Sequence, residues 1–282
     1  MGEISPAIYR AGEGEPLVLL HGFTGAWSHW RPVLAPLVAR YEVIAPTLAG
    51  HLGGPPKPDV VTIAGAGDAL ERQLDELGVS TAHFAGNSMG GALSLEMAKR
   101  GRARSVVALS PGGGWDPNGP EPERISRFFT RMVRMTKAAM PRAPLILRRP
   151  LARQLVFRDV MRHGELVAPP DGIELMRATL GCTVVDDVLA ALRDGKAETE
   201  DLEAVSAPTL IAWAQYDRIL PMALHAPRFR REIPGVDFRV LARVGHVPMW
   251  DDSSLVADTI AGWVDLHTPG VETAPVSVAG AA

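Results

Sequence analysis

Short apolar segments alternate with longer amphipathic segments along much of the chain, and this alternation constrains the fold more than any other feature of the sequence. The apolar segments are continuous, as expected for strands buried on both faces of a sheet. The expected strands are residues 16–20, 41–45, 81–86, 105–109, 209–214 and 237–241. The expected helices are residues 28–40, 62–78, 88–99, 222–231 and 253–266, with Thr62 and Ser253 as N-caps. This order predicts an α/β fold with a doubly wound, mostly parallel sheet.

The alternation stops in the middle of the chain. Between residues 112 and 206 the sequence has three proline-bounded helical stretches and no convincing strand. We therefore expect one α/β core of residues 1–114 and 206–267, interrupted by a helical cap of residues 115–205. Residues 268–282 show no periodic pattern and are expected to be disordered.

The charge of this insertion is divided between its two halves. Eleven basic residues and one acid, Asp159, lie between Arg124 and Arg162, whereas ten acids and three bases lie between residues 163 and 203. Arginines at steps of three and four form a basic stripe on the first expected helix, namely Arg124, Arg127, Arg131 and Arg134. The simplest interpretation is a solvated face that pairs with the acidic half. Attraction to an anionic substrate or to a membrane surface are the alternatives.

Composition excludes several other classes of protein. The 29 basic and 32 acidic residues give a net charge of −3, so no nucleic-acid partner is expected. Cys182 is the only cysteine, which excludes an intramolecular disulfide and a multi-cysteine metal site. No apolar run is long enough for a membrane span, and the N-terminus lacks a signal-peptide pattern, so a cytoplasmic protein is expected. The oligomeric state stays open.

One strand–helix junction carries a candidate nucleophile. Residues 86–90, Gly-Asn-Ser-Met-Gly, match the pattern G-x-S-x-G between an expected strand and an expected helix. A nucleophile elbow needs this setting, because its serine lies on a sharp turn that only small neighbours permit. The alternative is a tight turn with a structural serine. The pattern makes Ser88 the candidate nucleophile.

A serine hydroxyl needs a base to take its proton, and that base needs a third group to orient it. His246 follows the expected strand at 237–241 and is the best placed of the eight histidines. Asp217 follows the preceding strand and is the expected orienting acid. The alternatives are that Asp217 is a salt-bridged surface residue, or that Asp116 is the acid. The order Ser88, Asp217, His246 is one of the known chain orders of such triads.

The oxyanion that develops in acyl transfer needs N–H donors. The backbone N–H of Met89 lies at the N-terminus of the helix that follows Ser88, where the helix dipole favours negative charge. The second donor is expected in the loop His21-Gly22-Phe23-Thr24-Gly25, where Gly22 permits close approach and the N–H of Phe23 would point at the carbonyl. A purely structural turn is the alternative for this loop.

These motifs together resemble the α/β-hydrolase superfamily, over about residues 4–114 and 206–267. The resemblance rests on HGF at 21–23, GNSMGG at 86–91, the D-x-x-x-P from Asp217 to Pro221, and Gly245-His246. It implies that the insertion takes the place of the family's cap and lines the substrate pocket. It also implies that Phe23 and Met89 supply the oxyanion hole.

The subfamily is less well defined by these motifs. Ser88, in place of an aspartate, differs from haloalkane dehalogenases and epoxide hydrolases of this shape. GNSMGG with Ser110-Pro111-Gly112-Gly113 is similar to the carbon–carbon hydrolases that cleave ring-fission products. The sequence departs from those enzymes at Phe23-Thr24-Gly25 and at Val247, and from the family's usual Asp-x-Pro-Gly-His at Thr47 and Ala49.

The leading hypothesis is a carboxylesterase-like serine hydrolase that cleaves an ester, thioester or lactone of a small, apolar substrate through an acyl-enzyme. The candidate substrate-binding residues are Phe128, Phe129, Met132 and Val247. No metal or other cofactor is expected, because no His, Asp or Glu cluster has ligand spacing. One alternative is carbon–carbon hydrolysis of a ring-cleavage-type diketone. Another, of a different class, is a non-catalytic binder of a small ligand.

Overall fold

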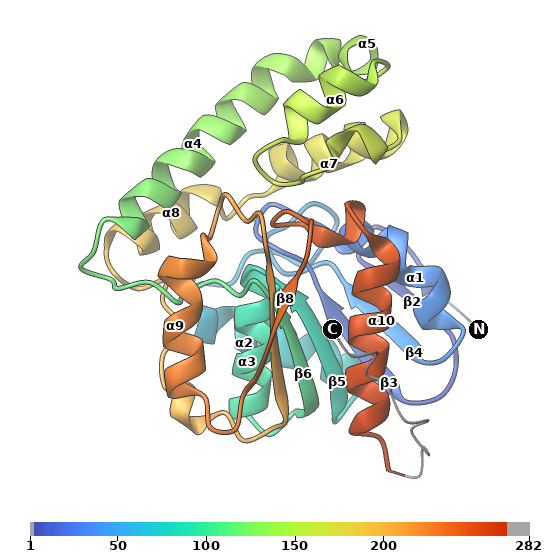
Figure 1. The fold of residues 1–282 in the computed structure, drawn as a ribbon, viewed down its shortest axis with the longest axis vertical. Helices are drawn as coiled ribbons and strands as arrows, with labels where there is room; N and C mark the ends of the chain where they lie inside the picture. Colours follow the sequence, from blue (N-terminus) through green and yellow to red (C-terminus); the bar gives the residue numbers. More distant parts are fainter. Residues whose placement is uncertain (1–2, 270–282) are drawn as a thin grey trace, which may run out of the picture.

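An eight-stranded sheet forms the centre of the computed structural model, which describes residues 3–269 (Figure 1). The strand order is β1-β2-β4-β3-β5-β6-β7-β8. The strands are β1 (Glu3–Ile4), β2 (Ile8–Ala11), β3 (Pro16–Leu20), β4 (Glu42–Pro46), β5 (Ala82–Asn87), β6 (Ala103–Leu109), β7 (Thr209–Ala214) and β8 (Asp237–Leu241). All neighbours from β4 to β8 pair in parallel, whereas β1 with β2 and β2 with β4 pair antiparallel. The predicted mostly parallel α/β sheet is confirmed.

Strands β1 and β2 were not expected from the sequence. They are short, and they form an antiparallel hairpin at one edge of the sheet, where β2 pairs with β4 from Ile8 opposite Pro46 to Ala11 opposite Val43. The sequence of a short edge strand shows little apolar periodicity. Its place in the sheet depends on backbone hydrogen bonds to the neighbouring strand.

Helices cover both faces of the sheet, and β3 shows why its sequence is a continuous apolar run. Leu17 and Leu19 belong to a core cluster with residues of α1 (Arg31–Val38) and α10 (Ser253–Leu266). Val18 and Leu20 belong to a second cluster on the opposite face. The helices of that face are α2 (Ile63–Glu76), α3 (Met89–Lys99) and α9 (Met222–Glu232). Alternate side chains of one strand therefore enter two separate cores.

The two expected helix caps have different outcomes. The hydroxyl of Thr62 accepts a hydrogen bond from the N–H of Gly65 (3.1 Å) and caps α2, as predicted. The prediction of Ser253 as the cap of α10 is wrong. Asp252 takes that position, and its carboxylate accepts from the N–H of Leu255 (2.9 Å) and from the hydroxyl of Ser254.

Five α-helices lie between β6 and β7, beyond the end of the sheet at the top of Figure 1. They are α4 (Glu121–Ala139), α5 (Ala143–Ile146), α6 (Pro150–Phe157), α7 (Pro169–Gly181) and α8 (Val185–Arg193). Helix α4 runs obliquely upward from the core, and α5 and α6 form the far tip (Figure 1). No helix within residues 3–269 is long and apolar enough to cross a membrane. Disorder was expected for residues 268–282, and residues 270–282 of this segment lie outside the described residues.

The ion pairs of this region differ from those expected. On α4, Arg124 pairs with Glu121 (2.7 Å) and Arg127 with Glu123 (3.5 Å), so two of the four arginines of the basic stripe pair within their own helix. The acidic half pairs with the core instead. Arg31 of α1 binds Asp171 and Glu174 of α7, and Lys57 binds Asp187 of α8. The expected pairing between the two halves is wrong. Helix α4 packs against α7 and α8, but Arg127, Arg131 and Arg134 are exposed, and the paired acids of α7 and α8 reach the core instead.

Candidate active site

Ser88 lies on the sharp turn between β5 and α3. Its backbone has φ 58° and ψ −117°, a combination that costs a side-chain-bearing residue conformational energy. The turn is held on both sides. The N–H of Ser88 donates to the carbonyl of Leu109 on β6 (2.9 Å), and the carbonyl of Ser88 accepts from the N–H of Gly112 (3.0 Å) and of Ala92 (3.1 Å). Neighbouring segments therefore hold the strained turn in place.

The small residues around Ser88 are required by close backbone approaches. A Cβ atom on Gly90 would lie 2.0 Å from the carbonyl oxygen of Leu20, and one on Gly86 would lie 2.0 Å from the carbonyl oxygen of Gly90. Neither position can accept a side chain without movement of the main chain. The turn thus brings α3 directly against the end of β3, where the loop with Phe23 begins.

Asp217 and His246 form a buried hydrogen-bonded pair. Nδ1 of His246 lies 2.7 Å from Oδ2 of Asp217, and both side chains are buried. The other carboxylate oxygen of Asp217 accepts from the N–H groups of Ile219 (2.9 Å) and Leu220 (2.7 Å). Because the carboxylate is an acceptor at Nδ1, the proton of a neutral His246 lies there and Nε2 is left as the basic nitrogen.

Sequence reasoning missed two residues that hold the His246 segment. The side-chain amide of Asn87 donates to the carbonyl of His246 (2.8 Å) and to that of Leu109 (3.2 Å). The buried carboxylate of Asp251 accepts from the N–H groups of Gly245 (2.6 Å), Arg162 (2.9 Å) and His163 (2.6 Å). The position of Asn87 beside Ser88 was a usable signal, whereas Asp251 gave none because two of its three partners, Arg162 and His163, are distant in sequence.

Asp116, the alternative acid, is not brought to His246. It is exposed, and its carboxylate accepts from the N–H of Asn118 (2.9 Å) in its own turn. Asp116 lines a separate surface groove with residues of α9.

The loop after β3 packs directly on Ser88. A Cβ atom on Gly22 would lie 3.3 Å from Cβ of Ser88, so glycine permits this approach. Phe23 borders both pockets that reach Ser88. Within residues 3–269, neither the N–H of Phe23 nor that of Met89 is bound to a protein acceptor. Two free donors therefore lie in the segments that flank the Ser88 hydroxyl.

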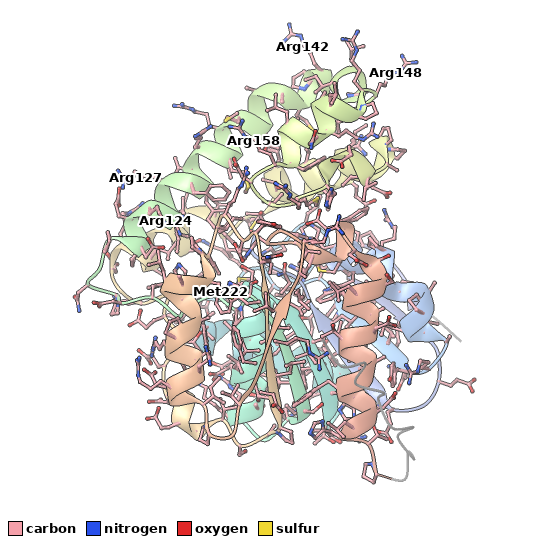
Figure 2. The ribbon with its side chains drawn as sticks, viewed as in Figure 1. Arg124, Arg127, Arg142, Arg148, Arg158 and Met222 are labelled. Atoms are coloured by element: carbon pink, nitrogen blue, oxygen red, sulfur yellow. The ribbon has the colours of Figure 1, made fainter. Side chains whose placement is uncertain are left out.

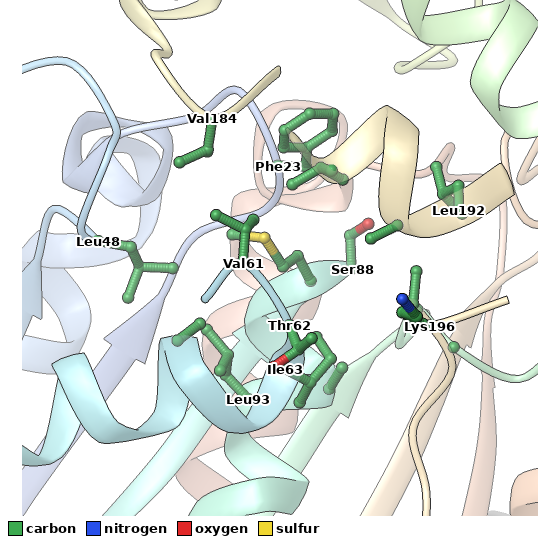
Figure 3. Close-up of a pocket in the computed structure, with 18 of the residues that line it drawn as sticks. Phe23, Leu48, Val61, Thr62, Ile63, Ser88, Leu93, Val184, Leu192 and Lys196 are labelled. Carbon is green, nitrogen blue, oxygen red and sulfur yellow. The ribbon is translucent and has the colours of Figure 1, made fainter. Parts of the chain in front are cut away.

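Two pockets meet at Ser88. The first, here the apolar pocket, lies among α2, α3 and α8, and Figure 3 shows the Ser88 hydroxyl at one side of it. Its lining is almost entirely aliphatic and aromatic, and Lys196 is its one residue with a permanent charge. The second, here the His246 pocket, is lined by His246 and by residues of α4, α6 and α7.

The four candidate substrate-binding residues lie in these linings. Phe128, Met132 and Val247 line the His246 pocket, and Phe129 lines both pockets. The ring of Phe129 lies 4.8 Å from that of Phe23, at a steep angle. Phe23 and Phe129 therefore form part of the boundary between the two pockets.

Three more histidines lie behind the Phe23 loop, and burial keeps them neutral. It lowers the pKa of His29 and His51 to about 4 and that of His21 well below its usual value. Nε2 of His21 accepts from the N–H of Leu48 (3.0 Å), and the rings of His21 and His51 lie 4.8 Å apart. Residues 3–269 hold no group of three or more His, Cys, Asp or Glu side chains that could bind a metal ion.

Comparison with known proteins shows the family of the chain. The model of the Alpha/beta hydrolase family matches residues 17–259. Epoxide hydrolase EphH of Mycobacterium tuberculosis is 31% identical over 216 residues, which make up 72% of this chain and 95% of that protein. A 2-hydroxy-6-oxo-6-phenylhexa-2,4-dienoate hydrolase of Burkholderia cepacia is 27% identical over 257 residues, 86% of this chain and 84% of that protein.

A solved structure is similar over nearly the whole chain. A thermophilic esterase from Thermogutta terrifontis has a TM-score of 0.69 and 24% identity, and the match covers 95% of this chain and 100% of that one. This likeness concerns the fold, whereas the family model and EphH establish the relationship by sequence. The chain is therefore a hydrolase of the alpha/beta hydrolase family.

Proposed function

We propose that this chain is a serine hydrolase that cleaves a carboxylic ester, thioester or lactone of a small, apolar substrate through an acyl-enzyme. The observation that carries the proposal is the buried 2.7 Å contact between His246 and Asp217, beside a pocket that both His246 and Ser88 line. A base oriented by a carboxylate is what a serine needs to act as a nucleophile.

In this mechanism the oxygen of Ser88 attacks the acyl carbon while Nε2 of His246 takes the hydroxyl proton. The N–H groups of Phe23 and Met89 stabilise the oxyanion that forms. The intermediate collapses as His246 gives the proton to the leaving oxygen or sulfur. A water molecule, deprotonated by His246, then attacks the acyl-enzyme and releases the acid and Ser88. Asp217 stabilises the imidazolium that forms in both steps.

The two pockets are assigned by the route of the proton. The leaving group receives its proton from His246 and therefore occupies the His246 pocket. The acyl group occupies the apolar pocket, which His246 does not line. Residues 115–205 act as a cap in this proposal, because α4 and α8 contribute Phe129 and Val188 to the pocket walls.

Epoxide opening, the activity named for EphH, fits this chain poorly. Attack on an epoxide carbon by the oxygen of Ser88 would leave an ether between enzyme and substrate. An ether has no carbonyl carbon for water to attack, so the enzyme would not turn over. A serine nucleophile therefore favours an acyl substrate.

Carbon–carbon hydrolysis is the second candidate, since the Burkholderia cepacia relative is named for a dienoate substrate of that kind. It would use the same serine, histidine and aspartate. A panel of p-nitrophenyl esters and a vinylogous diketo acid separates the two activities, and turnover of esters alone removes this candidate. Binding of either compound without turnover would favour the third possibility, a non-catalytic binder.

Labelling with a fluorophosphonate tests the nucleophile directly. We expect the wild type to be labelled at Ser88, and Ser88→Ala to lose both labelling and ester hydrolysis. Ser94→Ala is the matched control. Ser94 is a buried serine of α3, the helix that follows Ser88, and its hydroxyl donates to the carbonyl of Gly90. A folded wild-type protein that is not labelled at Ser88 would refute the proposal.

A further inference from the structure

The far tip of the helical region carries cationic charge that no nearby acidic segment balances. Residues 140–166, here the helical tip, contain six arginines and two acids. Only Arg153 of the six is buried. Three acids of the following helices are engaged elsewhere, because Asp171, Glu174 and Asp187 pair with Arg31 and Lys57 of the core. Figure 2 shows Arg142 and Arg148 projecting outward at the end of the molecule.

The same tip exposes leucines that belong to no core cluster. The exposed fractions are 68% for Leu145, 79% for Leu151, 62% for Leu155 and 64% for Leu166. Leu151 and Leu155 are four residues apart on α6 and therefore lie on one face of it. Exposed leucines that occur singly are ordinary, but four on one short helical tip need an explanation.

Apolar and cationic side chains meet in a groove along α6, here the α6 groove. It is lined by Leu151, Gln154, Leu155, Arg158, Met161, Arg162, Tyr216 and Arg218. Three guanidinium groups and no carboxylate line it, and within residues 3–269 the one carboxylate paired with them is that of Asp159, 3.7 Å from Nε of Arg158. Arg162 stacks on the ring of Tyr216, 4.8 Å from its centroid, and Arg218 donates to the carbonyl of Arg158 (3.2 Å). The groove thus combines an anion-attracting wall with an aliphatic wall.

Helix α6 lies between this groove and the His246 pocket, and Met161 borders both. Leu151 and Leu155 face the groove, whereas Val156 and Phe157 line the pocket. Exposed Met135 of α4 also borders the pocket, so its mouth lies beside the helical tip. A partner molecule bound over the α6 groove would therefore lie one helix away from the entrance to the His246 pocket.

We propose that the helical tip binds an anionic lipid surface, with Leu151 and Leu155 inserted among the acyl chains and Arg158, Arg162 and Arg218 on the lipid phosphates. The favoured partner follows from the exposure of the leucines and the chemistry beside them. Protein interfaces need a matched, closely packed partner surface, whereas a lipid layer accepts exposed leucines without a shaped complement. Basic side chains beside inserted apolar ones are attracted to negatively charged lipid headgroups. This binding does not depend on the role proposed for Ser88.

Vesicle co-sedimentation of the full chain tests the proposal. We expect binding to phosphatidylglycerol vesicles that weakens as salt is raised, and little binding to phosphatidylcholine vesicles. Leu151→Ser/Leu155→Ser should lower the partition coefficient more than about 10-fold, since two leucines no longer insert. Arg158→Gln/Arg162→Gln should lower it about 30-fold. Ser88→Ala should bind like the wild type.

Matched controls lie away from the tip. Leu266→Ser replaces a leucine that is 58% exposed at the end of α10, and Arg72→Gln replaces an exposed arginine on α2. Both should bind like the wild type, and all variants should retain the wild-type circular dichroism spectrum. Equal binding to the two kinds of vesicle, or full binding by the leucine variant, would overturn the proposal. So would binding to soluble polyglutamate that matches vesicle binding and ignores the leucines, because this would indicate an acidic protein partner.

Discussion

At Ser88 the main chain matters as much as the hydroxyl. The left-handed backbone of this residue, held by Leu109 and Gly112, presents the side chain at the meeting point of two pockets. Strain of this kind persists only where the surrounding structure compels it. Here the hydrogen bonds of Ser88 to Leu109, Gly112 and Ala92 hold the turn, and the glycines at 86 and 90 leave room for it. In the proposed mechanism the base is oriented by one carboxylate, that of Asp217.

Replacement of Asp217 by Asn should lower kcat/KM for a soluble ester by about 1000-fold or more. An amide N–H2 that faces Nδ1 would favour the tautomer of His246 with its proton on Nε2, which cannot accept the Ser88 proton. Steady-state kinetics measure the effect. Asp116→Asn is the control and should keep wild-type activity, because Asp116 lies in an exposed turn. Equal losses in both variants would contradict the assignment of the acid.

Replacement of Gly90 by Ala should lower the free energy of unfolding by about 3 kcal/mol or more, since the new Cβ would lie 2.0 Å from the carbonyl oxygen of Leu20. Urea denaturation measures this change. Gly262→Ala is the matched control, because no atom lies within 4 Å of the Cβ it would add in α10. That variant should be as stable as the wild type or more stable by about 1 kcal/mol.

At the scale of elements, the helices between β6 and β7 divide the surroundings of Ser88. Val188 and Leu192 of helix α8 line one pocket, together with Val184, the N-cap residue of that helix. Helix α4 contributes Met132 and Phe128 to the other. We therefore expect substitutions in α8 to change selectivity for the acyl group, and substitutions in α4 to change selectivity for the leaving group.

Val188→Trp should lower kcat/KM for long-chain acyl esters about 10-fold or more and leave acetyl esters nearly unchanged, because the larger ring fills the apolar pocket. Met132→Trp serves as the reciprocal variant. It should discriminate against bulky alcohols and not against long acyl chains. Esters that vary one side at a time measure the two effects. The opposite pattern would reverse the assignment of the pockets.

At the scale of the whole molecule, neutral buried histidines make the fold sensitive to acid. The folded state holds the pKa of His29 and His51 at about 4, below the usual 6.5, because both rings are buried. Between these values the unfolded chain binds more protons than the folded chain. The free energy of unfolding therefore rises with pH across this range. The contribution of these two histidines to stability is lost as the pH falls from about 6.5 toward 4.

His51→Gln should reduce this loss between pH 6.5 and 4 by about 2 kcal/mol, since one group no longer has to stay neutral. Denaturation at several pH values measures the slope, and His29→Gln should change it in the same direction. Above pH 7 the curves of the variants and the wild type should run parallel. An unchanged slope in both variants would show that these rings do not drive acid unfolding.

The sequence by itself determined the strands β3 to β8, the helices α1, α2, α3, α9 and α10, and the chain order of Ser88, Asp217 and His246. These features depend on local apolar periodicity and on glycine turns, which a linear pattern records directly. The sequence also identified Asp217 as a candidate acid, but it could not exclude Asp116. That decision required the position of each carboxylate relative to the His246 ring.

Only the tertiary structure decided which distant groups meet. It added the β1–β2 hairpin, moved the cap of α10 to Asp252, and revealed the contacts of Asn87 and Asp251 with the His246 segment. It also directed the acidic helices to Arg31 and Lys57, which leaves the helical tip cationic. Charge and hydrogen-bond partners are chosen by proximity in space, and a sequence pattern contains no such distances.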